Sequence, residues 1–231
     1  MEIDLNADLG EGAGFDAELM TLITSANICC GRHAGEPGIA AETLQLARLH
    51  RVTAGAHPGY PDRDHFGRRE LNVAEYALWA ECTFQIGGLI GLAKAEDTPV
   101  RYVKPHGALY NQACRDRQVA RCVVTAASHY DLPVVGLPGS ALAIEANTIV
   151  PFIAEGFADR RYRPDGSLVP RDQPDAFVRD PEEAVHQVEW LIREKGVRTI
   201  CVHGDNPQAV SFTRAVRAAL LARGVELKPF A

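Results

Sequence analysis

The chain has 231 residues, of which 46% are hydrophobic and 23% charged, a globular composition that excludes disorder, collagen-like repeats and a coiled coil as the main architecture. Its 24 basic and 30 acidic residues give a formal net charge of −6, so no general attraction to nucleic acid or to an anionic membrane is expected. The length suits one large domain or two small ones.

Short β-rich segments alternate with segments of helical length in the first half of the chain. Strands are expected at 3–5, 25–30 and 52–56, and helices at 16–23, 37–50 and 73–95. The apolar residues Leu44, Ala47 and Leu49 recur at helical spacing within the second of these helices. Asp16 is positioned to cap the first one.

The second half of the chain continues this alternation. Strands are expected at 100–104, 133–137, 151–155, 199–202 and 225–228, and helices at 115–130, 140–149, 181–195 and 207–223. Proline opens the last two helices, a position where its missing N–H is tolerated. The segment 156–180 interrupts the rhythm with arginine, aspartate and proline, and connections of that length are typical of lids and binding loops.

About seven βα units without a linker indicate an α/β fold with a parallel sheet, formed as a single domain over residues 1–231. A closed or nearly closed, TIM-like parallel β/α barrel is the favoured arrangement. An open doubly wound sheet is the alternative, because periodicity alone does not separate the two folds.

Most of the chemically unusual side chains come shortly after a predicted strand. In parallel α/β folds these positions emerge at one end of the sheet, where sites are built. The residues placed in this way are Asn6, Asp8, Glu11, Asn27, His33, His57, Lys104, His106, Asp159, Arg160, His203 and Asp205. Four of the eight histidines belong to this set, which surface solvation does not explain. The pattern therefore predicts one common site.

Individual members of this set also have structural interpretations. Asp8 and Glu11 lie in the sequence DLGEG and could form a tight turn. His33 could cap the following helix, and His57 could be an ordinary loop residue. A lysine at a strand end, such as Lys104, usually lies along apolar surface or pairs with an acid. Because unusual titratable residues concentrate in functional sites, the set as a whole favours a site.

The six cysteines include no C-x-x-C pair, so they match neither a zinc motif nor a secreted disulfide framework. The first residues carry acids instead of a basic signal-peptide start, and the most apolar helical stretch, at 84–93, is too short to span a bilayer. These features predict a cytoplasmic protein with reduced thiols. Cys30, which precedes His33, could be a nucleophile, although a buried strand cysteine is the commoner case.

Phosphate and metal motifs are weak or missing. The glycine-rich segment at 10–14 matches neither phosphate-binding loop pattern, and its Glu11 and the neighbouring Asp8 would repel phosphate. A carboxylate and histidines from different strand ends could hold a divalent metal. Asp8, His57 and His106 are the candidate ligands, although no local H-x-x-x-H or H-E-x-x-H motif supports a metal.

Eight segments resemble the LamB/YcsF family. They follow one another in the family's order over nearly the whole chain: DLNADLGEG at 4–12, SANICCGRHAG at 25–35, GAHPGYPD at 55–62, FGRR at 66–69, VKPHGALYN at 103–111, FADRRY at 157–162, GSLVPR at 166–171 and VHGDN at 202–206. Two positions depart from the family's usual residues. Ala7 replaces a frequent cysteine, so an essential thiol there is not expected. Arg32 replaces an aromatic residue and adds positive charge near the predicted site.

The resemblance implies a distorted seven-stranded β/α barrel related to the glycoside hydrolase/deacetylase superfamily. It further implies one subunit of an ATP-dependent 5-oxoprolinase, which opens the lactam of 5-oxoproline (pyroglutamate) to L-glutamate together with two partner subunits, B and C. ATP would be a co-substrate bound mainly by the partners, since this chain has no phosphate loop. Association into a homo-oligomer stays open.

Roles in that reaction follow for the clustered residues. Asp8 or a histidine would be the general base, Lys104 and His106 would stabilise the oxyanion, and Arg160 would bind the substrate carboxylate. His203 and Asp205 would form a proton relay. The catalytic set is thus Asp8, Glu11, His33, His57, Lys104, His106, His203 and Asp205, and the substrate-binding set is Asn6, Asn27, Asp159 and Arg160.

Two other functions fit the same residues. The first is a metal-dependent deacetylase that acts alone on amidated sugars through Asp8, His57 and His106. The second is a non-catalytic subunit that only presents small molecules to a partner. A bound divalent metal and cleavage of N-acetyl sugars without ATP would favour the first. In the second case, replacing Asp8, Lys104 or His106 by alanine would change binding and leave turnover of the complex nearly intact.

Overall fold

Seven parallel strands close into a barrel in the computed structural model, which describes residues 1–203 and 208–231. In chain order they are β1 (Glu2–Leu9), β2 (Ser25–Cys29), β3 (Thr53–His57), β4 (Val100–Val103), β5 (Val134–Gly136), β6 (Phe152–Phe157) and β7 (Thr199–Val202). Each strand pairs with the next one, and β1 also pairs with β7, which closes the ring. The predicted barrel is confirmed, and the open doubly wound sheet is wrong.

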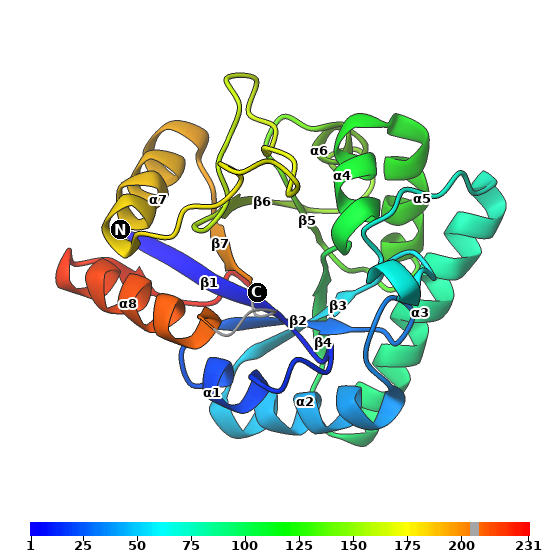
Figure 1. Cartoon of the computed structure of the whole chain (residues 1–231). Helices are drawn as coiled ribbons and strands as arrows, with labels where there is room; N and C mark the ends of the chain where they lie inside the picture. The colour runs from blue at the N-terminus through cyan, green and yellow to red at the C-terminus, as the bar shows by residue number, and fades with distance from the viewer. Residues whose placement is uncertain (204–207) are drawn as a thin grey trace.

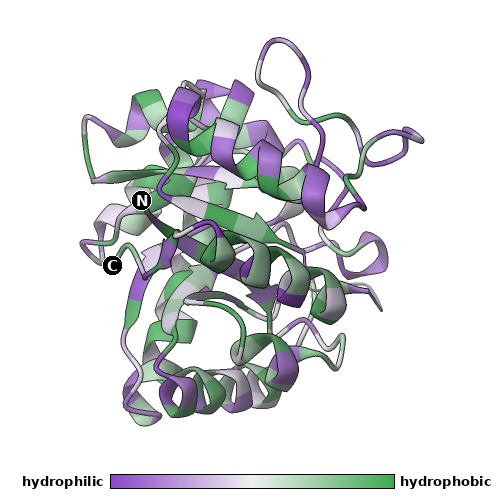
Figure 2. Ribbon diagram, turned by 90° about the vertical axis from the view of Figure 1, so that its left-hand side faces the viewer, coloured by the Kyte–Doolittle hydropathy of each residue, from purple (hydrophilic) through white to green (hydrophobic). Residues whose placement is uncertain are grey.

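Helices surround this ring of strands (Figure 1). They are α1 (Asp16–Met20), α2 (Pro37–His50), α3 (Glu75–Ala95), α4 (Gly107–Arg115), α5 (Arg117–Ser128), α6 (Ala141–Ala146), α7 (Pro181–Lys195) and α8 (Ala209–Ala222). Hydrophilic and hydrophobic residues alternate along these helices in Figure 2, as expected for helices with one face on the sheet. No described helix combines the length and the apolar character needed to cross a membrane.

The expected helix at 115–130 is in fact preceded by a further helix that the sequence analysis missed. α4 ends at Arg115, and the extended residue Asp116 separates it from α5. The Asp116 carboxylate accepts a hydrogen bond from the Gln118 backbone N–H at 2.9 Å, which caps α5. An aspartate followed by a helical pattern is an N-cap signal, so the sequence contains a signal for the start of α5.

Three other local expectations have different outcomes. Asp16 does not cap α1, because its carboxylate instead accepts hydrogen bonds from the Gly10 N–H at 2.8 Å and the Thr43 hydroxyl at 2.9 Å. The closing strand is present as β8 (Glu226–Leu227) and pairs with the start of β1 outside the ring. Pro207, the predicted start of the last helix, lies outside the described residues.

The barrel interior is polar along β1. Side chains alternate along a strand, and on β1 the polar residues Asp4 and Asn6 alternate with core residues, all of them buried: Ile3, Leu5, Ala7 and Leu9. Asn6 Nδ2 lies 3.1 Å from Glu155 on β6 and 2.6 Å from Thr199 on β7. This buried polar column leads to Asp8 at the end of the strand.

The connection between β6 and α7 forms the projecting loop at the top of Figure 1. Isolated β-bridges join Arg160 to Phe177 and Tyr162 to Leu168, which folds the loop back on itself. The loop therefore has a defined shape in the region where the sequence interrupts the βα rhythm, and it contributes side chains to the site described next.

Candidate active site

A pocket opens at the carboxyl ends of the barrel strands, the end at which β/α barrels place their sites. Side chains of both signs of charge line it together with aromatic ones: Asp8, Glu11, His57, Arg68, Lys104, His106, Tyr110, Asn111, Phe157, Arg160, Leu168, Arg171 and His203. Seven of the twelve residues predicted to share a site line this one pocket: Asp8, Glu11, His57, Lys104, His106, Arg160 and His203. Position after a strand was therefore an effective signal.

Asp8 lies at the centre of the polar contacts. One carboxylate oxygen accepts from Asn27 Nδ2 at 2.7 Å and from Lys104 Nζ at 3.0 Å, and the other lies 3.4 Å from His57 Nε2. Burial opposes the charged form, but the charges of His57 and Lys104 outweigh burial and hold the pKa of Asp8 well below its usual value. Asp8 is therefore ionised, and 11% of its side chain is exposed to the pocket.

The two histidines beside Asp8 have fixed ring orientations. His57 Nδ1 lies 2.7 Å from the Lys104 carbonyl oxygen, and His106 Nε2 lies 2.9 Å from the Phe66 carbonyl oxygen. A carbonyl oxygen only accepts hydrogen bonds, so both nitrogens carry hydrogen. The opposite nitrogens, His57 Nε2 and His106 Nδ1, are 3.0 Å apart. Two neutral rings would present lone pairs to each other there, so a proton or a cation must lie between them.

The protonation states of these two rings differ. Burial, followed by the nearby His33, lowers the pKa of His106 to about 4, so this ring is neutral near pH 7. Burial also disfavours a charged His57, but the Asp8 carboxylate more than offsets it and raises the pKa of His57. A proton shared between the rings would therefore reside on His57.

Glu11 and His33 complete a group of four donor atoms. Glu11 Oε1 lies 3.2 Å from His33 Nε2, 3.2 Å from His106 Nδ1 and 3.9 Å from His57 Nε2. All four donor atoms lie within 4.8 Å of one another. Burial would raise the pKa of Glu11, but its contacts with the His106 and His33 rings hold it well below its usual value. We call these four residues the histidine–glutamate cluster.

Two glycines determine how closely the rings of this cluster pack. The His33 and His106 rings stack with centroids 3.7 Å apart. A Cβ on Gly59 would lie 2.5 Å from His33 Nδ1, and a Cβ on Gly67 would lie 2.6 Å from His33 Cβ. Gly67 also has a φ of +63°, which residues with a side chain rarely adopt. The backbone of the loop after β3 therefore packs directly on the histidines.

Replacing Gly67 by alanine is expected to destabilise the fold and to displace His33. The positive φ alone costs about 1–2 kcal/mol, and overpacking adds about 1–3 kcal/mol. Gly166→Ala is the matched control, because Gly166 also has a positive φ (+86°) but has no atom near its Cβ position. Urea unfolding of both variants checks this prediction, and equal losses of stability would contradict it.

Lys104 is buried and has acidic partners on two strands. Its Nζ lies 3.0 Å from Asp8 and 2.9 Å from Glu155, and it also contacts Asn6 Oδ1 and Cys201 Sγ. Burial opposes the charge of Lys104, but Asp8 and its other partners raise its pKa well above the usual value. The sequence offers Lys104 either as a partner of an acid or as a site residue. The structure is compatible with both, since the side chain pairs with acids and also lines the pocket.

His203 directly follows β7 and has its own acidic partner. Its Nδ1 is 2.8 Å from Asp159 Oδ2, and its backbone N–H donates to the same oxygen at 3.1 Å. Burial would raise the pKa of Asp159, but His203 holds it below its usual value. Asp205, the partner predicted for His203, lies outside the described residues. Among the described residues, Asp159 is the carboxylate that holds His203 in place.

Asn6 and Asn27 lie beneath the pocket and do not line it. Asn27 Nδ2 donates to Asp8 at 2.7 Å and to Asn6 Oδ1 at 2.7 Å, while Asn6 Oδ1 also faces Lys104. These amides orient the Asp8–Lys104 pair. Their predicted contact with substrate stays a prediction.

Six of the side chains that line the pocket escaped the sequence analysis: Arg68, Tyr110, Asn111, Phe157, Leu168 and Arg171. Arg171 and Arg68 lie in loops far from any strand end, and Tyr110 lies on α4. The FGRR and GSLVPR segments of the family resemblance contain the two arginines, so a signal for them was present.

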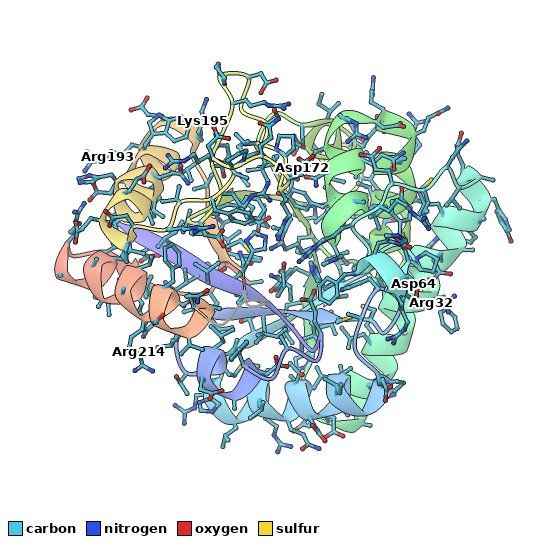
Figure 3. All side chains as sticks on the ribbon, viewed as in Figure 1. Arg32, Asp64, Asp172, Arg193, Lys195 and Arg214 are labelled. Carbon is cyan, nitrogen blue, oxygen red and sulfur yellow. The ribbon has the colours of Figure 1, made fainter. Side chains whose placement is uncertain are left out.

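Two other residues lie away from the chemistry suggested for them. Burial raises the pKa of the Cys30 thiol well above its usual value, and it is Cys29 whose Sγ lies 3.3 Å from His33 Nε2. Arg32 pairs with Glu81 at 2.5 Å and does not line the pocket. Figure 3 shows Arg32 beside α3 at the outer edge of the molecule. The cysteines Cys29, Cys30, Cys82, Cys114, Cys122 and Cys201 are all free thiols.

Known proteins resemble the chain over its whole length. The model of the LamB/YcsF family matches residues 3–231. A protein of Thermus thermophilus, the A subunit of 5-oxoprolinase, is 44% identical, with 100% of both chains covered. A protein of the same name from Neisseria meningitidis serogroup C is 45% identical, with 98% of both chains covered.

Solved structures give the same picture of the fold. A lactam utilization protein from Thermus thermophilus superposes with a TM-score of 0.92 at 42% identity, with 100% of both chains covered. A family 4 carbohydrate esterase from Streptomyces lividans has a TM-score of 0.53 at 12% identity, covering 100% of this chain and 93% of the esterase. The second likeness extends to the fold alone.

Proposed function

The chain belongs to the LamB/YcsF family, and we propose that it is the A subunit of an ATP-dependent 5-oxoprolinase. It acts as a hydrolase on the cyclic amide bond of 5-oxoproline and yields L-glutamate. The whole chain works as a single barrel domain in the cytoplasm, where its free thiols are stable, and the enzyme is completed by partner subunits B and C. Full-length identity of 44–45% to proteins of that name supports this assignment.

The observation that carries the chemistry is the ionised, partly exposed Asp8 between His57 and Lys104. Opening a lactam requires a water molecule at the carbonyl carbon and a proton at the departing ring nitrogen. Asp8 is placed to orient the water and to take its proton.

The proton for the ring nitrogen comes from a second group. His203 is oriented through its Nδ1 by Asp159, which leaves Nε2 to face the pocket that His203 lines. We assign His203 as the acid that protonates the departing nitrogen, with Asp159 as its positioning residue. A base and an acid held by separate partners can work in opposite protonation states.

The oxyanion of the reaction needs donors other than those first predicted. Four acceptor atoms, on Asp8, Glu155, Asn6 and Cys201, surround the three hydrogens of Lys104 Nζ, and the Nε2–H of His106 is directed to Phe66. Lys104 therefore acts by holding Asp8 in place and ionised. The arginines that line the pocket, Arg68, Arg160 and Arg171, supply the remaining positive charge.

ATP enters this proposal as a co-substrate of the assembled enzyme. A lactam is a poor electrophile, so transfer of the γ-phosphoryl group of ATP to its carbonyl oxygen, with release of ADP, activates it. Water then adds to the carbonyl carbon and the C–N bond breaks as the ring nitrogen takes up a proton. The acyl phosphate left by this step is hydrolysed by a second water molecule to glutamate and inorganic phosphate. The 10–14 segment has no phosphate-binding loop pattern. ATP is therefore bound mainly by the partner subunits, and this chain binds the lactam.

The histidine–glutamate cluster fits a divalent metal such as zinc. Three ring nitrogens and one carboxylate oxygen form a typical donor set, and all four residues are mostly buried. His57 and His106 each use the second ring nitrogen on a backbone carbonyl, as metal-binding histidines do. A cation would also resolve the facing lone pairs of these two rings. When bound, it would polarise a carbonyl or a water oxygen.

Metal analysis of the purified chain tests this fit without an activity assay. We expect close to one equivalent of zinc or another divalent metal per chain, removed by a chelator, and a Co²⁺-loaded chain with visible absorption. His106→Ala is expected to weaken metal binding about 10-fold or more. His50→Ala, an exposed position on α2, is the control. Absence of bound metal from the wild type after incubation with zinc would leave a proton on His57 as the link between the rings.

Reconstitution tests the proposed function directly. The chain is mixed with its candidate partner subunits, 5-oxoproline and ATP, and glutamate and ADP are measured. We expect glutamate only when all components are present. A well-folded complex that produces no glutamate would contradict the proposal.

A metal-dependent deacetylase acting alone is the second candidate. The histidine–glutamate cluster favours it, because that donor set alone could activate a water molecule. Release of acetate from N-acetylated sugars by the purified chain without ATP would support this alternative.

A further inference from the structure

We propose that Tyr102 is a positioning residue for the reaction and that it holds Asp8 in place through the side-chain amide of Asn27. The inference rests on the proposed function, in which Asp8 is the general base, and it adds a residue that does not line the pocket. Tyr102 lies on β4 and Asn27 on β2, so the contact between them passes over the intervening strand β3. Both residues are fully buried.

A glycine on β3 leaves the space that the Tyr102 ring fills. The strand register places Asp8 beside Asn27 and Asn27 beside Gly55, and β3 pairs in turn with β4. A Cβ on Gly55 would lie only 2.2 Å from atoms of the Tyr102 ring. Any side chain at position 55 would therefore displace this ring. Its absence lets the Tyr102 hydroxyl reach across one strand to Asn27.

Apolar side chains hold the Tyr102 ring in this position. The ring clusters with Val135 on β5 and Ile153 on β6, and the ring of Phe230 packs against it with the centroids 4.9 Å apart. Burial, followed by the charge of Asp4, raises the pKa of Tyr102 well above its usual value. The hydroxyl therefore keeps its hydrogen, and packing of the ring sets where this hydrogen can be donated.

The hydrogen bonds of the Asn27 amide have one consistent set of directions. The ionised carboxylate of Asp8 only accepts hydrogen bonds, so the atom of Asn27 that lies 2.7 Å from it is the amide nitrogen. The second hydrogen of this nitrogen goes to Asn6 Oδ1, also at 2.7 Å. Asn27 Oδ1 then faces Tyr102, whose hydroxyl donates to it at 2.7 Å. Tyr102 thereby completes the bonding that turns the Asn27 nitrogen toward Asp8.

Loss of the Tyr102 hydroxyl would leave Asn27 Oδ1 as a buried acceptor without this donor, which is costly. The amide gains by turning to another donor, and this rotation takes its nitrogen away from Asp8. A carboxylate that is slightly misplaced relative to the attacking water slows the chemical step. Substrate binding is unaffected, because neither Tyr102 nor Asn27 lines the pocket.

Steady-state kinetics of the reconstituted enzyme with Tyr102→Phe test this role, since the substitution keeps the ring and removes the hydroxyl. We expect kcat for glutamate formation to fall about 10- to 100-fold, with the KM for 5-oxoproline unchanged. Tyr60→Phe is the matched control. Tyr60 is also buried, at 1% exposed, and donates to Gln112 Oε1 at 2.7 Å, but this partner lies on α4 outside the pocket. The control should lose as much stability in urea as Tyr102→Phe and should keep the wild-type kcat.

A double variant determines whether Tyr102 acts through Asn27. Asn27→Ala removes the amide, so the addition of Tyr102→Phe to it should lower kcat no further. A full additional loss in the double variant would overturn the proposal. A wild-type kcat in a folded, assembled Tyr102→Phe enzyme would overturn it as well.

A crystal structure of the full chain with Tyr102→Phe separates failure of this inference from failure of the proposed function. We expect the Asn27 amide to be turned, with its nitrogen beyond hydrogen-bond distance of Asp8. An unchanged contact of 2.7 Å between them would refute the positioning role alone. A turned amide, together with a wild-type complex that forms no glutamate, would refute the proposed function and retain the link from Tyr102 to Asp8.

Discussion

Asp8→Asn is expected to lower glutamate formation by the assembled enzyme by about 10²- to 10⁴-fold, the usual contribution of a positioned general base. The amide keeps the shape of the carboxylate but has no negative charge, so it cannot take a proton from water. The loss should appear in kcat, because Asp8 acts on the attacking water and the arginines hold the substrate. Steady-state assays over a range of 5-oxoproline concentrations measure it.

The control for this substitution is Asp64→Asn. Asp64 is an exposed acid in the loop after β3 (Figure 3) and does not line the pocket. It should retain full activity. Thermal unfolding and co-purification with the partner subunits establish that Asp8→Asn is folded and assembled. A folded, assembled Asp8→Asn enzyme with more than half of the wild-type kcat would show that Asp8 is not the base.

Lys104→Met is expected to reduce the free energy of unfolding by about 3–5 kcal/mol, the usual cost of removing one partner from a buried ion pair. The substitution leaves Asp8 and Glu155 as buried carboxylates without their shared cation. Methionine has a similar length, so loss of packing contributes little. Urea unfolding at pH 7 gives the measurement.

A second substitution distinguishes charge from packing. Glu155→Gln removes one of the stranded carboxylates, so the double variant Lys104→Met, Glu155→Gln should regain part of the lost stability. The coupling energy between the two positions is the quantity to compare. Simple additivity of the two losses would contradict a charge-based role for Lys104.

The sequence predicted the position of the site well because one topological rule governs it. Side chains that follow parallel strands converge at one end of the barrel, whatever the loops between them do. Asp8, His57 and His106 lie at or just after strand ends, so this rule predicts that they share one site. Alternation along β1 likewise follows from strand geometry, which turns Asp4 and Asn6 toward other strands and Leu5 toward the core.

Partnerships between distant residues were beyond the same rule. Nothing in the local pattern indicates that Asp159 binds His203, since 44 positions separate them. The contribution of Arg171 depends on how the loop after β6 folds back through its β-bridges. Ring orientations in the cluster depend on backbone carbonyls such as that of Phe66, in a loop whose conformation the sequence does not specify. These features arise from tertiary contacts, which local sequence patterns do not specify.

A crystal structure of the assembled enzyme with 5-oxoproline and a non-hydrolysable ATP analogue tests the central claim most directly. We predict the lactam in the pocket of this chain, with its carbonyl carbon toward Asp8 and its carboxylate near the arginines, and the nucleotide in one of the partner subunits. A lactam bound only to the partner subunits, or the nucleotide seated in the Asp8 pocket, would contradict the account.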